Sequence, residues 1–358
     1  MSFRVLIVKM SALGDIVHAL PVLDYLHQAS PGIEVDWVVE ESFREILEGN
    51  PLISQSHIVR TKVWRKHLFS LSVWNEISVV KTALQNRKYD FVFDIQGNIK
   101  SGVVSWLSDC KRRYGFAKAD VRESLNTRFI NNCIPLRRQD YHISDRALRV
   151  ISVPFGKDYT EFSLHTDIST SLEDDLNAET FIATLSDSFV IVIHHGTTWK
   201  TKLWYEEGWV ELGKRLLKSY PDANILLSWG GEEEHKTAQS IAEGIKGNAR
   251  LLPELSLKGL TAIYKKVDLV IGGDTGPLHI AAAVGTPTVS LYRATDGKRN
   301  GPRGDLARIV QSPLPCTKCL NKECKRDSEC KESITVDMMQ QACDELLAFN
   351  GDSSDKTN

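Results

Sequence analysis

The 358-residue sequence lacks several features that would place it in a special class of protein. Charge of one sign is not in excess, because 44 basic residues stand against 46 acidic ones and the formal net charge is -2. The overall charge therefore predicts no nucleic-acid partner. No stretch approaches the roughly 18 apolar residues of a membrane span, and the short apolar run that ends at Lys9 is unlike a signal peptide. We expect a cytoplasmic protein whose membrane contact, if there is any, is peripheral.

Cysteine is too scarce for a disulfide-built fold, with seven in the chain. Three cysteines stand apart and are predicted to be buried thiols: Cys110, Cys133 and Cys343. The other four follow the spacing C-x2-C-x4-C-x5-C: Cys316, Cys319, Cys324 and Cys330. This spacing fits a structural zinc site, although it lacks the paired C-x2-C form. Reduced, metal-free thiols and a disulfide pair stay open as alternatives.

The composition is that of an ordinary globular protein, with 42% hydrophobic and 25% charged residues. The first half alternates strand and helix patterns, with strands predicted at 3–8, 35–40 and 89–95 and helices at 16–28 and 79–86. Polar residues dominate from 140 to 187. The alternation then restarts, with strands predicted at 189–194, 224–229, 268–271 and 288–292 and helices at 206–219, 232–245, 257–265, from 277, and at 336–349.

Such alternation implies parallel sheets covered by helices on both faces. The length exceeds what one hydrophobic core usually serves. We therefore predict two Rossmann-like α/β domains, residues 1–170 and 171–358, that face each other across a cleft. In such folds ligands bind beyond the carboxyl ends of the strands. The small polar tail at 351–358 is predicted to be disordered.

A glycine-rich turn from Gly272 to His279 follows one predicted strand and opens a helix. Its glycines let the backbone approach a ligand, and Pro277 suits the first helical position. The free N–H groups and the dipole of the helix start favour a phosphate. Taken alone, the turn is equally well explained by Asp274 as a helix cap, with His279 as a packed histidine.

The segment 194–204 (HHGTTWKTKLW) lies at the carboxyl end of the first strand of the second half. Its hydroxyls, on Thr197 and Thr198, and its lysines can hold a diphosphate. A departing nucleotide gains negative charge as the sugar bond breaks, so a cation such as Lys202 is needed there. The alternative is a solvated basic loop, and the phosphate site predicted on the neighbouring strand end argues against it.

A third motif, residues 9–15, follows the first strand and ends at Asp15. A helix start favours the ionised form of a carboxylate, and an ionised Asp15 could take a proton from an attacking hydroxyl. Its alternative role is that of a helix-start residue. Basic side chains gather at 60–66, 111–113 and Arg122, either as solvated surface or to grip a phosphorylated or carboxylated acceptor.

In this order the motifs resemble the lipopolysaccharide heptosyltransferases, most closely heptosyltransferase I. The matching segments are VLIVKMSALGDIVHALP at 5–21, DWVVEE at 36–41, DIQG at 94–97, KLW at 202–204, WG at 229–230 and DTGPLH at 274–279. The resemblance implies a glycosyltransferase B-type fold and an inverting transfer that requires no metal or other cofactor. It also implies ADP-L-glycero-D-manno-heptose as the donor and the inner Kdo of Kdo-lipid A as the acceptor.

The resemblance also implies roles for single residues. Asp15 would be the base, and Lys202 would hold the diphosphate. The donor would contact Thr197, Thr198, Glu234, Asp274, Thr275, Gly276 and His279. The acceptor would contact Ser11, Gly14, Arg60, Arg65, Lys66, Gln96 and Arg122.

Other functions stay open at this point. The cysteine segment at 316–330 resembles other branches of the family, so heptosyltransferase II or a member with a related acceptor is an alternative. A sugar-nucleotide epimerase would share the two-domain fold without needing a lipid acceptor. An NAD-dependent dehydrogenase is disfavoured, because the first strand–helix turn lacks G-x-G-x-x-G. A non-catalytic protein that binds sugar nucleotides is the fourth possibility.

Overall fold

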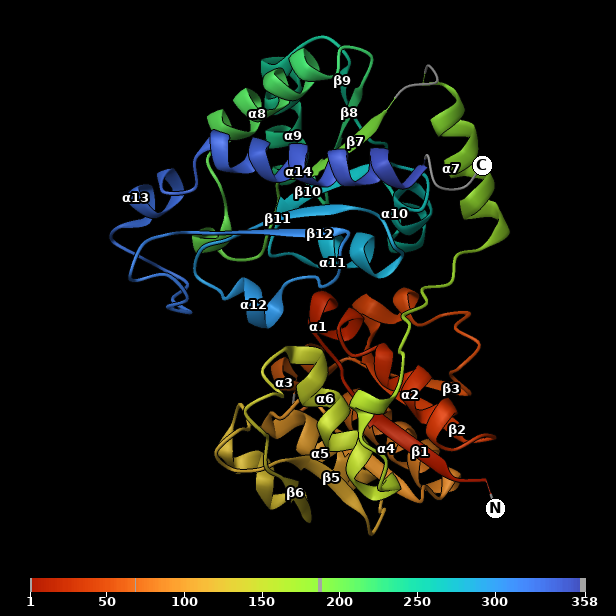
Figure 1. Ribbon diagram of the computed structural model, residues 1–358. Coiled ribbons are helices and arrows are strands. Elements are labelled where there is room, and N and C mark those ends of the chain that lie inside the picture. Colours follow the sequence, from red (N-terminus) through yellow and green to blue (C-terminus); the bar gives the residue numbers. More distant parts are fainter. Residues whose placement is uncertain (1, 68, 186–188, 355–358) are drawn as a thin grey trace. The chain divides into compact units, whose positions relative to one another are not determined.

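The computed structural model describes residues 2–67, 69–185 and 189–354. The chain divides into two compact α/β units, residues 1–169 and 170–358 (Figure 1). The division falls one residue from the boundary that the sequence suggests. Each unit has its own parallel sheet and is described by itself.

The N-terminal unit is built on six parallel strands in the order β3-β2-β1-β4-β5-β6. The strands are β1 (Arg4–Val8), β2 (Glu34–Glu40), β3 (Gln55–Val59), β4 (Phe91–Asp94), β5 (Arg113–Phe116) and β6 (Asn132–Ile134). The helices are α1 (Leu13–Val17), α2 (Pro21–Ala29), α3 (Thr61–Lys66), α4 (Leu71–Arg87), α5 (Ile99–Leu107) and α6 (Ile143–Ser152). The apolar run of β1 is buried from Val5 to Val8, as expected for a central strand covered on both faces.

The C-terminal unit has six parallel strands in the order β12-β11-β10-β7-β8-β9. The strands are β7 (Val190–His194), β8 (Asn224–Ser228), β9 (Ala249–Leu251), β10 (Leu269–Gly273), β11 (Thr288–Tyr292) and β12 (Ala307–Gln311). The helices are α7 (Leu172–Ala183), α8 (Glu206–Ser219), α9 (Glu232–Ile245), α10 (Leu257–Tyr264), α11 (Gly276–Ala283), α12 (Gly297–Asn300), α13 (Asp327–Glu332) and α14 (Val336–Ser354).

Helices of the C-terminal unit form two packed groups, one with α8, α9 and α14 and one with α7, α10 and α11 (Figure 1). The core joins the first group to the strands β7, β8, β10 and β11. Helix α14 adds three fully buried side chains to it: Met339, Cys343 and Leu346. The last helix of the described chain is therefore part of the core rather than an appendage.

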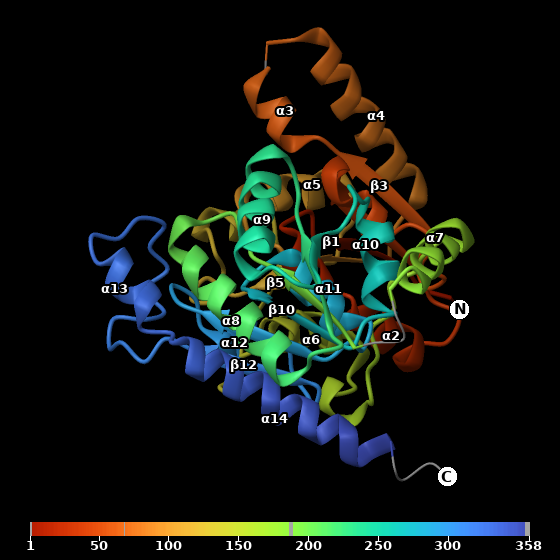
Figure 2. The same cartoon turned by 90° about the horizontal axis from the view of Figure 1, so that it is seen from above.

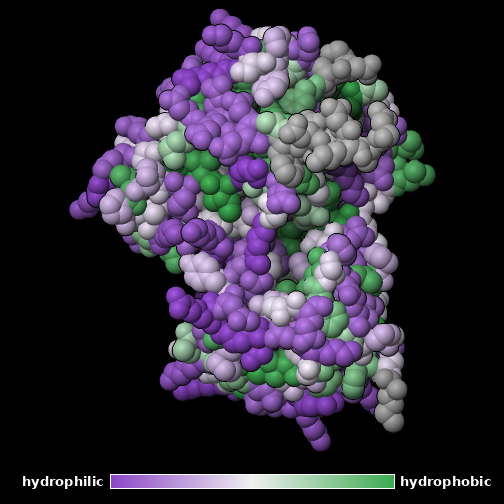
Figure 3. Space-filling view, in the orientation of Figure 1, coloured by the Kyte–Doolittle hydropathy of each residue, from purple (hydrophilic) through white to green (hydrophobic). Residues whose placement is uncertain are grey.

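The outer surface is largely polar on the face seen in Figure 3, where hydrophobic residues appear in scattered groups. Among the residues that the structure describes, no helix is both long enough and apolar enough to cross a membrane. The apolar stripes of the helices instead pack onto their sheets, as amphipathic helices of globular proteins do.

The order of the strands in each sheet determines where a ligand site can lie. Both sheets have the order 3-2-1-4-5-6, since β7, β8 and β9 take the places of β1, β2 and β3. The direction in which successive strands are added to the sheet reverses beside the first strand, which opens a crevice beyond the strand ends. In the N-terminal unit that point lies between β1 and β4, and in the C-terminal unit between β7 and β10. The motifs predicted from the sequence follow these four strands.

The structure corrects three predictions. The polar stretch 140–187 contains α6 and α7, and α6 buries an apolar face. Cys133 is exposed, because β6 is an edge strand with one side open, whereas Cys110 and Cys343 are buried as predicted. Helix α14 reaches Ser354, four residues into the tail predicted to be disordered, and residues 355–358 lie outside the described chain.

Candidate active site

The C-terminal unit brings two predicted loops together at the ends of β7 and β10. The Thr197 Oγ1 hydroxyl donates a hydrogen bond to the backbone oxygen of Asp274 over 3.2 Å, which ties the loops to each other. Gly272 allows this approach, since a Cβ there would stand 2.9 Å from the His194 backbone oxygen. The glycine of the turn is therefore needed for close strand packing.

Asp274 is the centre of the site. Its carboxylate lies 2.7 Å from Lys202 Nζ and 3.2 Å from His279 Nε2, and it accepts a 2.7 Å hydrogen bond from Thr295 Oγ1. Burial alone would raise the pKa of Asp274, but the hydrogen bond from His279 and the charge of Lys202 outweigh it and hold the pKa well below its ordinary value. The carboxylate is thus ionised and fixes Lys202 at the strand ends.

Lys202 is also held from the other side. Its Nζ lies 4.9 Å from the ring centre of Trp199, within cation–π range. A second cation, Lys322 Nζ, lies 5.2 Å from the same ring. The sequence motifs did not point to Lys322, which comes from the cysteine segment and reaches this site only through folding.

The start of α11 supplies backbone donors beside this cation. Thr275 is the N-cap residue, Pro277 occupies the first turn, and the helix continues to Ala283. Thr275 and Gly276 are partly exposed, whereas His279 is buried with its ring against Asp274. Free N–H groups and the helix dipole make such an end attractive to a phosphate. His279 acts on this site through Asp274.

Glu234 lies at the start of α9, beyond the end of β8. Its Oε2 accepts a 2.8 Å hydrogen bond from the Gly230 backbone N–H. Burial raises the pKa of Glu234 above its ordinary value despite this bond. A Cβ at Gly196 would lie 2.3 Å from the Glu234 carboxyl group, so a larger residue there would force the Glu234 side chain to move. Thr198 is exposed on the neighbouring loop.

In the N-terminal unit, Asp15 lies on α1 in the turn that follows β1. Its Oδ2 accepts a 3.3 Å hydrogen bond from the Ala12 backbone N–H and lies 3.9 Å from Lys9 Nζ. The Asp15 side chain is 31% exposed, and Ser11 and Gly14 are partly exposed in the same turn. A carboxylate that is both held in place and open to solvent can accept a proton from a bound hydroxyl.

Gln96 and Asp94 hold this turn from β4. Gln96 Oε1 accepts hydrogen bonds from the backbone N–H groups of Met10 (3.0 Å) and Ser11 (3.1 Å). Asp94 is fully buried and accepts hydrogen bonds from the N–H groups of Gln96 and Gly97 and from the side chains of Ser101 and Asn126. Burial raises the pKa of Asp94 nonetheless. Asp94, a second carboxylate at this end of the sheet, is therefore closed off from solvent.

Cations border the same edge of the N-terminal unit. Arg122 is exposed next to the Gly97 turn. Lys100, which the motifs did not indicate, reaches Thr61 Oγ1 over 3.4 Å at the start of α3. Arg60 is paired with Glu76, which also accepts a hydrogen bond from Trp64 Nε1. Arg65 and Lys66 are exposed at the far end of α3. Arg60, Lys100 and Arg122 thus form an inner group of basic residues, and Arg65 and Lys66 form an outer group.

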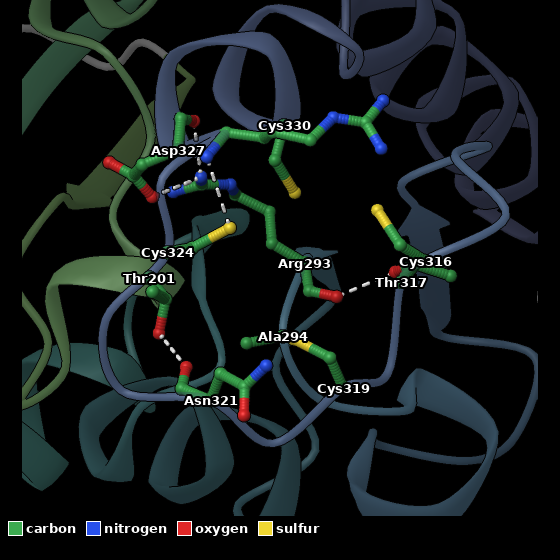
Figure 4. A pocket seen from close by; sticks show the side chains of 11 residues that line it. Thr201, Arg293, Ala294, Cys316, Thr317, Cys319, Asn321, Cys324, Asp327 and Cys330 are labelled. Atoms are coloured by element: carbon green, nitrogen blue, oxygen red, sulfur yellow. Dashed lines mark hydrogen bonds and ion pairs between the residues drawn. The ribbon is translucent and has the colours of Figure 1, made fainter.

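The four cysteines of 316–330 all line one cavity of about 130 Å³ in the C-terminal unit (Figure 4). Arg293 crosses it, donating hydrogen bonds to the Leu203 carbonyl oxygen and to the Asp327 carboxylate. All seven cysteines are free thiols. Within the described ranges, no three His, Cys, Asp or Glu side chains are arranged to hold a metal ion. The structure brings the thiols to one cavity without assembling a ligand set.

Two Rossmann-like units, one with a cation beside a helix start at its switch point, fit the fold of the two-domain glycosyltransferases of the B type, the fold class that the sequence predicted. The chain belongs to glycosyltransferase family 9, the heptosyltransferases, whose family model matches residues 77–329. Lipopolysaccharide heptosyltransferase 1 of Pseudomonas aeruginosa is 34% identical over 329 residues, which cover 90% of this chain and 87% of the relative.

Solved structures agree with this assignment. The heptosyltransferase WaaC of E. coli, solved with ADP, is 30% identical with a TM-score of 0.77, covering 96% of this chain and 99% of WaaC. WaaC has also been solved with ADP-2-deoxy-2-fluoro heptose, with a TM-score of 0.73, 30% identity and the same coverage of both chains. Family membership favours a transferase over an epimerase, a dehydrogenase or a non-catalytic binding protein.

Proposed function

We propose that the protein transfers L-glycero-D-manno-heptose from ADP-heptose to the Kdo of Kdo-lipid A, with inversion and without a catalytic metal ion. The observation that carries this proposal is the Lys202–Asp274 ion pair, 2.7 Å long, beside the start of α11. The relatives solved with ADP and with an ADP-heptose analogue support the choice of donor.

The donor half of the reaction needs positive charge where the ADP leaving group forms. Lys202 and the backbone N–H groups at Thr275 and Gly276 supply it together. Asp274 and His279 keep Lys202 in position, and Thr197 and Thr198 add hydroxyls from the loop after β7. Glu234 is placed at the end of β8, where the ribose of a nucleotide would lie in a Rossmann-type site. These groups take the place that a metal ion holds in other transferases.

The acceptor half needs a base on the face of the sugar opposite the leaving group. Asp15 takes this role in the proposal, because it is held by Ala12 N–H and yet open to solvent. Gln96 keeps the Met10–Ser11 backbone in place through its two hydrogen bonds. Arg122, Lys100 and Arg60 lie along the same edge and suit the carboxylate of a Kdo sugar.

The acceptor is a lipid, so we place the enzyme in the cytoplasm with peripheral contact to the inner membrane. The choice of Kdo, rather than a heptosylated core acceptor, rests on the resemblance to the heptosyltransferase 1 relatives. A preparation that transfers heptose only to already heptosylated Kdo-lipid A would move the assignment to heptosyltransferase II.

Transfer of labelled heptose from ADP-heptose to Kdo-lipid A tests the proposal. Wild-type protein should transfer in the presence of a chelator, and Lys202→Ala should lower kcat on the order of 100-fold, since a preorganised cation is lost. Lys200→Ala is the matched control, because Lys200 is exposed at the start of the short 3-10 helix Lys200–Lys202 that also holds Lys202. Calorimetry should rank ADP above UDP and GDP. Tight binding of UDP with none of ADP would reject the heptose donor.

A further inference from the structure

The hairpin made by α3 and α4 carries large apolar side chains on its outside. Figure 2 shows the two helices standing out from the sheet of the N-terminal unit, with their connecting turn at the tip. Phe69 is fully exposed in that turn, and Leu71 and Trp74 in the first turns of α4 are 83% and 56% exposed. Exposed apolar side chains that gather in one place mark an interaction surface.

These side chains are not needed by the core of the hairpin. The inner face of α4 packs Val73 and Leu84 into the cluster that also holds Val59 and Trp64. Val73 and Leu84 are the buried residues of this 17-residue helix. Phe69, Leu71 and Trp74 therefore lie on a separate, outward surface, which we name the hairpin tip together with Arg65 and Lys66.

The charge around the hairpin tip has one sign. Exposed cations flank the apolar side chains: Lys62, Arg65, Lys66 and Lys81. The sequence from residue 60 to residue 82 contains a single acidic residue, Glu76. Glu76 is engaged, since it pairs with Arg60 and accepts a hydrogen bond from Trp64 Nε1. The outer surface is thus aromatic, aliphatic and cationic.

We propose that the hairpin tip docks on an anionic lipid bilayer. Aromatic rings with an apolar body suit the level of the headgroups, and lysines and arginines beside them attract anionic lipid phosphates. An apolar contact and a basic patch together give reversible binding that neither gives alone. The inference rests on the proposed function in one respect, the lipid nature of the acceptor, and it assigns membrane contact to named residues of this chain.

Sedimentation with vesicles tests the docking without donor or acceptor. Wild-type protein should bind vesicles of phosphatidylglycerol and phosphatidylethanolamine at least about ten-fold more tightly than vesicles of phosphatidylcholine, because the basic patch contributes. The triple variant Phe69→Ser, Leu71→Ser, Trp74→Ser should lose at least about ten-fold in binding to the anionic vesicles. Its melting temperature should match that of wild type, since the substituted side chains are exposed.

The matched control is Leu172→Ser with Leu176→Ser on α7, where the two leucines are 76% and 53% exposed. This double variant should bind vesicles as wild type does. Heptose transfer to a Kdo acceptor without acyl chains should be unchanged in the triple variant. If wild-type protein does not transfer heptose to this acceptor, the proposed function is wrong. Vesicle binding then still tests whether the hairpin tip docks on a bilayer.

Three outcomes overturn the docking. Wild-type protein does not bind anionic vesicles, or the triple variant binds them as tightly as wild type does. In the third outcome, wild-type protein self-associates without lipid, and the triple variant no longer does so but still binds vesicles. The hairpin tip is then a contact between protein chains.

Discussion

Carboxylates in this chain differ in their surroundings, and the difference separates a candidate base from residues that hold the backbone. Asp94 is fully buried among four donors, and Asp274 is buried in an ion pair. Asp15 keeps 31% of its side chain exposed beside the turn it stabilises. Of these three, Asp15 is the one that a sugar hydroxyl could reach.

Asp15→Asn should therefore lower kcat by at least about 100-fold, the size expected for a positioned base. The affinity for ADP should not change, because the donor residues lie in the other unit. Steady-state kinetics with Kdo-lipid A and calorimetry with ADP measure the two quantities. Transfer at a near wild-type rate, or loss of activity through unfolding alone, would remove Asp15 from the mechanism.

His195 makes stability depend on pH. Burial lowers its pKa to about 4, below the ordinary value of about 6.5. Between these values the unfolded chain binds a proton that the folded chain does not, so the free energy of unfolding falls as the pH drops from 6.5 toward 4. The loss amounts to as much as about 3 kcal/mol.

Urea unfolding of His195→Asn measures this contribution. The stability advantage of wild type over the variant should shrink as the pH drops through that window. His165→Asn is the control, because His165 is exposed, and its unfolding curves should follow wild type at each pH. A wild-type advantage over His195→Asn that stays constant from pH 7 to pH 4.5 contradicts the prediction.

The sequence pointed to Asp15, Lys202 and Asp274 because each lies in the segment that follows a strongly apolar strand: β1, β7 and β10. It did not indicate Lys100, which stands outside any motif, or Lys322, which lies within the cysteine segment but is no part of its cysteine pattern. Lys100 reaches Thr61 across 39 positions, and Lys322 reaches the ring of Trp199. Contacts of this kind depend on tertiary packing, and no local spacing encodes them. The predicted role of Gln96 in acceptor binding stays a prediction, although its Oε1 is already engaged by backbone.

At the scale of elements, the turn after β1 depends on a side chain from β4. Gln96→Leu should destabilise the protein by about 1–3 kcal/mol, because two backbone N–H groups lose their acceptor. Gln96→Glu retains an acceptor oxygen and should recover most of that loss. Chemical denaturation compares the variants, and equal stability of the leucine and glutamate forms would mean that the two hydrogen bonds contribute little.

The cysteine segment is the element whose role the sequence predicted least firmly. Structural zinc stays a prediction: purified protein should carry about one zinc per chain, with Zn–S distances near 2.3 Å. The thiols would have to close in around the cavity, and the segment would then brace the donor loop through the Thr201–Asn321 hydrogen bond. Metal-free protein whose stability a chelator leaves unchanged would reject zinc.

Elements with long apolar runs or a clear helical period were predictable, and short or strongly charged elements were not. The sequence predicted β1, β7 and β10 because central strands of a parallel sheet are apolar throughout. β6 and β9 have three residues each and lie at sheet edges, so their sequences carry little pattern. α6 was overlooked because Asp145, Arg146 and Arg149 make its outer face charged, although Leu148 and Ile151 on its other face are buried.

At the scale of the whole molecule, the predicted acceptor and donor residues belong to separately folded units. Arg65→Ala with Lys66→Ala should raise the KM for Kdo-lipid A and leave ADP affinity unchanged, because both residues lie on α3 of the N-terminal unit. Kinetics with varied acceptor, alongside ADP calorimetry, separates the two effects. A parallel fall in ADP affinity would mean that the basic residues are structural or belong to the donor site.

Helix α14 affects the order in which the two units can fold during synthesis on the ribosome. The N-terminal unit closes on residues up to 169, so it can fold while the rest is still being made. The C-terminal unit can complete its folding only after Met339, Cys343 and Leu346 have been made, because these side chains cover its core beside β11 and β12. A chain cut short before α14 would thus present a finished N-terminal unit joined to a C-terminal unit with its apolar core open, a natural substrate for chaperones and proteases.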